Sequence, residues 1–125
     1  MPKTVPDLPG IVSDLPISQA IEAGGLVFLA GQVGSAPGGH GAVPGGIEAE
    51  TRAMLDNVGR LLHALGLDYP DVVKCTVYLL DFTDFPAMNA VWREYFPSDP
   101  PTRATVGVTA LAADFRIEIE TIATR

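Results

Sequence analysis

One segment near the middle of the chain constrains the fold most, because its apolar residues recur at the spacing of an α-helix. Between residues 47 and 65 they form one stripe: Thr51 (by its methyl group), Met54, Leu55, Val58, Leu61, Leu62 and Leu65. Such a stripe predicts a helix that buries one face against another layer. Glu48 and Glu50 fall in its first turn, where acidic groups complement the helix dipole, and Gly66 is placed to end it.

The segments around this helix carry strand signals and one further helix. A Gly-Gly turn separates two short apolar segments, which predicts a hairpin. The last segment alternates Phe115, Ile117 and Ile119 with polar residues, as a half-buried strand does. The predicted elements are strands at 17–21 and 26–30, a helix at 47–65, a strand at 72–80, a helix from about 84 to 96, and strands at 104–108 and 115–123.

The order of these elements predicts an α+β fold, with one mixed β-sheet and two helices packed on one face. The length suits a single domain over residues 1–125, with the proline-rich residues 1–15 as an extended arm. Residues 26–30 are apolar on both faces of their strand, yet the chain holds no third layer to cover the second face. We therefore expect a homo-oligomer.

Composition excludes several classes of function and location. The net charge is −7 and only Lys3 and Lys74 are lysines, so no basic stripe is present and we expect no nucleic-acid partner. The longest apolar run is far shorter than the roughly twenty residues of a membrane span, and the N-terminus lacks a signal-peptide pattern. The single cysteine, Cys75, cannot form an internal disulfide, which favours the cytoplasm.

The usual metal and cofactor motifs are missing. His40 and His63 form no ligand pair with each other or with Cys75, so we expect no metal site. The glycine-rich residues 31–46 are predicted to form a surface loop, and they match neither a phosphate loop nor a dinucleotide fingerprint, which argues against those two kinds of site. Cys75 lies within an apolar strand, where a cysteine is usually a small hydrophobic residue.

Arg103 and Glu118 are the candidates for chemistry. Arg103 follows two prolines at the start of an apolar strand, where it is either a surface residue or a clamp for a carboxylate. If its strand pairs antiparallel with the last strand, Glu118 lies near the bound acid and positions a water molecule. Alternatively, Glu118 belongs to the solvent face of an amphipathic strand, and the pattern leaves both interpretations open.

Several motifs in a fixed order resemble the RidA/YjgF family of reactive intermediate deaminases, from about residue 16 to 123. They are residues 30–33 (AGQV), 55–58 (LDNV), 73–81 (VKCTVYLLD), 84–89 (DFPAMN), Trp92 with 95–96 (YF), 101–106 (PTRATV) and 117–123 (IEIETIA). The resemblance implies a chorismate-mutase-like fold, a homotrimer with clefts between subunits, and no cofactor or metal. It also implies hydrolysis of 2-imino or enamino acids, such as 2-iminobutanoate, to 2-oxo acids and ammonium.

The resemblance assigns roles to individual residues. Arg103 matches the arginine that binds the substrate carboxylate, and Glu118 the glutamate that orients or deprotonates the attacking water. Gly31 matches the cleft-lining loop, and the backbone near Thr105 matches the contact to the water. Asn89 matches a further residue of the site, which we interpret as structural.

Three departures from the family change the predicted pocket: Ile17 replaces the usual tyrosine, Ala30 a serine and Thr105 a cysteine. The cleft loses a phenolic hydroxyl and gains an apolar wall. An alternative function is therefore a non-catalytic module that binds a 2-oxo acid or an amino acid. A third is a hydrolase that acts on another substrate, or a ribonuclease. RNA is the weakest of the candidate substrates, because the chain is acidic.

Overall fold

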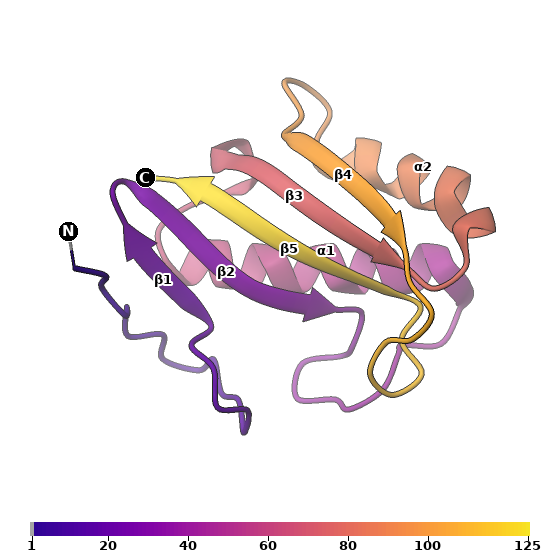
Figure 1. The fold of residues 1–125 in the computed structure, drawn as a ribbon, viewed down its shortest axis with the longest axis horizontal. Helices are drawn as coiled ribbons and strands as arrows, with labels where there is room; N and C mark the ends of the chain where they lie inside the picture. The colour runs from indigo at the N-terminus through magenta and orange to yellow at the C-terminus, as the bar shows by residue number, and fades with distance from the viewer. Residues whose placement is uncertain (1) are drawn as a thin grey trace.

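Five strands form one sheet and two helices lie behind it in the computed structural model, which describes residues 2–125 (Figure 1). The predicted α+β class, with a mixed sheet and both helices on one face, is confirmed. The elements are β1 (Ala20–Ala23), β2 (Leu26–Val33), α1 (Gly46–Ala64), β3 (Val72–Leu79), α2 (Phe85–Tyr95), β4 (Thr102–Gly107) and β5 (Ile117–Thr124), with short 3-10 helices at Tyr69–Asp71 and Phe82–Asp84.

The strand order is β1-β2-β5-β3-β4, so the last strand of the chain occupies the centre of the sheet. β3 and β4 run parallel, because α2 returns the chain to the end at which β3 began. The other pairs are antiparallel. From the sequence we considered that the strand containing Arg103 pairs directly with the strand containing Glu118, and this pairing is wrong. β3 lies between them, because β5 bonds to both β2 and β3 and leaves β4 at the edge.

The largest differences from the predicted strand boundaries lie in β1 and β2, whereas β3, β4 and β5 differ by one or two residues at their ends. β1 begins at Ala20, because the preceding residues continue the N-terminal arm. β2 continues to Val33, into the segment predicted as loop, because it pairs with β5 again after a bulge between Leu29 and Gln32. The bulge bends β2 and interrupts its ladder beside Gly31.

The core lies between the helices and one face of the sheet, which we call the helix face. Every residue of the predicted α1 stripe is buried, as are Met88 and Trp92 of α2. The strands contribute Val27, Leu29, Cys75, Val77, Leu79, Ile117 and Ile119. Cys75 is 1% exposed and burial raises the pKa of its thiol to about 11, so its prediction as a small hydrophobic residue is confirmed.

The opposite face of the sheet, called the outer face here, has no layer over it within residues 2–125. Phe28 and Val106 are each 40% exposed there. The arm before β1 joins the sheet through a bridge between Thr4 and Glu22, and its residue Ile11 packs on the core. Neither helix in the described range is long and apolar enough to cross a membrane.

Candidate active site

Arg103 projects from the edge strand β4 on the helix face, because its register partner on β3 is the buried Cys75. Its guanidinium lies against α2. Nη2 donates a hydrogen bond to Oδ1 of Asn89 at 2.7 Å, and Nη1 lies 3.7 Å from the sulfur of Met88. The carbon Cζ lies 4.8 Å from the ring centroid of Trp92 and 5.5 Å from that of Phe85. Amide and rings together hold the guanidinium in a defined orientation.

This guanidinium carries a charge that the described part of the chain does not neutralise. No carboxylate of residues 2–125 lies within 4.0 Å of it. Burial lowers the pKa of Arg103, since removal from water disfavours the cation. An arginine has five N–H donors, and only one bonds to a protein oxygen here. The remaining donors fit a small anion. Thr105 lies two residues further along β4, on the same face, opposite Val77.

Glu118 belongs to a second group of residues, on the outer face of β5. It pairs with Tyr78 of β3 and with Val33 of β2. Its carboxylate lies against Gly31, where an added Cβ would be only 2.7 Å from Oε2. Gly31 therefore provides the space that this carboxylate occupies. Burial raises the pKa of Glu118, and the nearby Glu120 adds to the effect.

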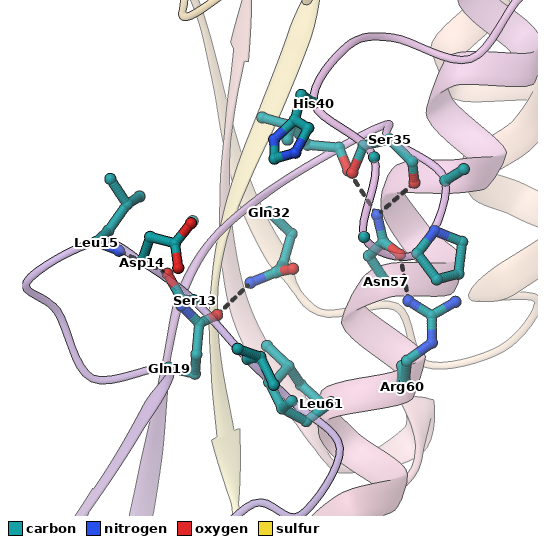
Figure 2. A pocket seen from close by; sticks show the side chains of 18 of the residues that line it. Ser13, Asp14, Leu15, Gln19, Gln32, Ser35, His40, Asn57, Arg60 and Leu61 are labelled. Carbon is teal, nitrogen blue, oxygen red and sulfur yellow. Dashed lines mark hydrogen bonds between the residues drawn. The ribbon is translucent and has the colours of Figure 1, made fainter.

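A cavity of about 680 Å³ opens beside Glu118 and Gly31, where β2 extends beyond β1. The arm and residues 35–40 form two of its walls, and α1 forms a third. Figure 2 shows Asn57 and Arg60 of α1 on one side, with the amide of Gln32 directed toward Gln19 on the other. Asn57 donates to the carbonyls of Val33 and Ser35 at 2.8 and 3.0 Å, which ties α1 to the end of β2.

The predicted site residues thus form two half-sites within one chain. One holds Arg103, Asn89 and Thr105 on the helix face of β4, and the other holds Glu118 and Gly31 at the outer face of β5 and β2. Because β3 separates them and they use opposite faces of the sheet, one small substrate cannot contact both within a single chain. Ile17 is 53% exposed on the arm and lies outside the residues that line the cavity.

A protein-family model described as endoribonuclease L-PSP matches residues 11–125, nearly the whole chain. The chain belongs to this family, the RidA/YjgF family. A 2-iminobutanoate/2-iminopropanoate deaminase from Capra hircus is 44% identical to this RidA-family chain over 108 residues, which cover 86% of the chain and 79% of that protein.

Solved structures agree with this assignment. The crystal structure of the Escherichia coli YjgF gene product is 34% identical, with a TM-score of 0.86 and 98% of each chain covered. E. coli TdcF, solved with bound serine, is 35% identical with a TM-score of 0.82, over 94% of the RidA-family chain and 92% of TdcF.

The sequence did not identify the residues that support the two half-sites of this RidA-family chain. Phe85 and Trp92 were noted in the sequence only as parts of family motifs, but their rings face Arg103 in the structure. Glu50 was predicted as a first-turn residue beside the helix dipole, but it is fully buried. Apolar spacing could not reveal these contacts, because they depend on which elements pack together.

Proposed function

We propose that this protein hydrolyses small 2-imino acids and their enamino tautomers, such as 2-iminobutanoate, to 2-oxo acids and ammonium. The observation that carries the proposal is the half-buried guanidinium of Arg103, which has free donors and no carboxylate partner within the described residues. A planar guanidinium binds a carboxylate through two parallel hydrogen bonds. The deaminase relative and the serine complex of TdcF support a small acid with nitrogen on C2.

The chemistry follows from the two half-sites. Arg103 holds the carboxylate and so fixes the adjacent C=N carbon. Glu118 accepts a proton from a water molecule, whose oxygen bonds to that carbon while the C=N π electrons move to nitrogen. The proton held by Glu118 then passes to the nitrogen, which gives a tetrahedral 2-amino-2-hydroxy acid. Glu118 next takes the hydroxyl proton and delivers it to the nitrogen; the C=O bond forms as the C–N bond breaks, and the products are a 2-oxo acid and ammonia, which is protonated in neutral water.

We further propose that the two half-sites meet between subunits of a homotrimer with a chorismate-mutase-like fold. Arg103 and Glu118 lie on opposite faces of one sheet, so the pair must come from different copies of the chain. The exposed Phe28 and Val106 of the outer face supply apolar surface for such an interface. In this assembly residues 1–125 act as one RidA-like domain; Met1 lies outside the described residues.

The proposal is tested by following hydrolysis of freshly generated 2-iminobutanoate with the purified protein. Arg103→Ala should lower kcat/KM by about tenfold to a hundredfold or more, because a charged hydrogen-bonded contact contributes about 1.5–3 kcal/mol. Arg52→Ala is the matched control, since Arg52 is an exposed arginine on α1 that pairs with Glu94, and its loss should leave turnover unchanged. Native turnover in the Arg103 variant would exclude this mechanism.

The same samples distinguish the non-catalytic alternative. Titration with 2-oxobutanoate measures binding without turnover. Saturable binding that depends on Arg103, with no acceleration of imine hydrolysis, would identify a binding module in place of an enzyme.

RNA is the weaker substrate, although the matching family model is described as an endoribonuclease. A net charge of −7 opposes the approach of a phosphate backbone. The proposed compartment is the cytoplasm, in agreement with the unpaired, buried thiol of Cys75.

A further inference from the structure

Glu50 is a carboxylate that the proposed reaction does not use, yet it is completely buried on α1. A buried carboxylate is stable only where hydrogen bonds and opposite charge replace its water. Glu50 has three such partners. Its Oε2 accepts from the backbone N–H of Arg116 at 2.7 Å and of Ile117 at 3.3 Å, and its Oε1 accepts from Nε of Arg116 at 3.3 Å.

These donors belong to the residues that lead directly to Glu118. Ile117 is the first residue of β5 and Glu118 is the second. The side chain of Arg116 is 42% exposed, whereas both backbone donors are held next to the buried carboxylate. Hydrogen bonds to an ionised acceptor are stronger than those between neutral groups. Glu50 therefore anchors the backbone one residue before the proposed catalytic base.

Glu50 also contacts the neighbouring strand. Gly34 follows Val33, the register partner of Glu118. A Cβ added at Gly34 would lie 2.3 Å from the carbonyl oxygen of Glu50 and 2.5 Å from its Cγ, so the glycine backbone packs directly on this residue. Glu50 thus contacts both strands: its carboxylate binds the start of β5, and its backbone and Cγ pack against the residue that follows β2.

We propose that Glu50 is a positioning residue of the active site, which fixes Glu118 by anchoring the start of β5 against α1 and the end of β2. This inference rests on the proposed function, in which Glu118 activates water. Arg103 projects from β4 on the other face of the sheet, and its partners come from α2. Loss of the anchor should therefore impair the chemical step and spare binding of the carboxylate.

The test replaces Glu50 with methionine, which has similar length but offers no carboxylate oxygen. Glu50→Met should lower kcat for 2-iminobutanoate by roughly 10-fold to 100-fold, because small displacements of a catalytic group are costly. The KM and the affinity for 2-oxobutanoate should stay within about twofold of native. Glu48→Met is the matched control on the exposed surface of the same helix, and should not change kcat.

Two further measurements keep the result interpretable. Glu50→Gln retains one acceptor oxygen and should lose less kcat than Glu50→Met; it carries the test alone if the methionine variant does not fold. Amide hydrogen exchange at Arg116 and Ile117 should become faster in either variant, which is measurable without any turnover.

Native kcat in both Glu50 variants would overturn the proposal. So would parallel losses of kcat and of 2-oxobutanoate affinity, because these would indicate general disruption of the fold. Failure of the proposed function looks different: the native protein would then not accelerate imine hydrolysis at all, whereas the exchange result at Arg116 and Ile117 would remain.

Discussion

At the scale of single residues, burial acts on the two proposed catalytic groups in the way their roles require. It lowers the pKa of Arg103 and raises the pKa of Glu118, because low polarity disfavours both charged forms. Arginine nevertheless stays cationic at neutral pH. A bound anionic substrate would therefore supply the opposite charge that this partly buried cation lacks. A glutamate with a raised pKa is a better proton acceptor than an ordinary one.

The raised pKa of Glu118 has a consequence for the pH dependence of turnover. A base must be deprotonated, so kcat/KM should fall as the pH drops through the pKa of Glu118 in the free enzyme. Burial is the larger cause of the raised pKa and Glu120 the smaller. Glu120→Gln removes a like charge, which lowers the pKa of Glu118, so the acid limb of the pH–rate profile should move to lower pH.

The control for this shift is Glu94→Gln, which removes an exposed carboxylate that lies on α2, behind the helix face, and pairs with Arg52. The hydroxyl of Tyr78 donates to Glu120 and can still donate to a glutamine oxygen, so the local arrangement should survive the test substitution. An acid limb at the same pH in the native protein and Glu120→Gln would contradict the prediction.

At the scale of elements, the packing of the 3-10 helix Tyr69–Asp71 on α1 depends on a close approach between Tyr69 and Gly59. The hydroxyl of Tyr69 donates to the carbonyl of Leu55 at 2.8 Å. The ring packs edge-on against Tyr95 and Phe96, at centroid distances of 5.4 and 5.9 Å. Burial raises the pKa of Tyr69 to about 12, as expected for a phenol enclosed by neighbouring elements.

Gly59→Ala tests this contact. Alanine normally stabilises a helix by about 1 kcal/mol relative to glycine. Here its Cβ would lie 2.1 Å from the Tyr69 hydroxyl oxygen and 2.7 Å from Cζ, so the ring must move. We expect the free energy of unfolding to fall by about 1–2 kcal/mol, because overpacking outweighs helix propensity. Urea unfolding measures this free energy. The loss of stability should be smaller in a Tyr69→Phe background, because the hydroxyl oxygen nearest to the new Cβ is then absent. Equal or greater stability would contradict the prediction.

At the scale of the whole molecule, the proposed mechanism makes oligomerisation a condition of activity, because Arg103 and Glu118 lie apart within one chain. A chain that is active alone would need both residues on one face of the sheet, and the register puts them on opposite faces. The exposed apolar residues of the outer face point to the same conclusion, because a partner chain would cover them.

Mixed oligomers provide a direct test. Arg103→Ala and Glu118→Gln subunits should each be strongly impaired alone, but co-expression should produce some clefts with both native residues. If each cleft takes Arg103 from one subunit and Glu118 from the next, random mixing in equal amounts should restore about a quarter of native activity. No recovery, in mixtures shown by mass spectrometry to contain both subunits, would contradict the shared site.

Much of this architecture could be predicted because helix and strand periodicity are local properties of the backbone. The α1 stripe and the alternation in β5 depend only on residues near in sequence, and both predictions are confirmed. The extension of β2 beyond Ala30 could not be predicted, since it depends on hydrogen bonds to β5, which comes some ninety residues later.

The sequence by itself determined which faces of the helices and strands are apolar, and it offered Arg103 and Glu118 as candidates whose roles the family resemblance then assigned. Only the tertiary structure decided that β5 inserts between β2 and β3, which places these two residues on opposite faces. It also decided that Glu50 is a buried anchor. The physical reason is that side-chain spacing depends on local backbone geometry, whereas strand order and side-chain partners depend on which surfaces of the whole chain can be buried together.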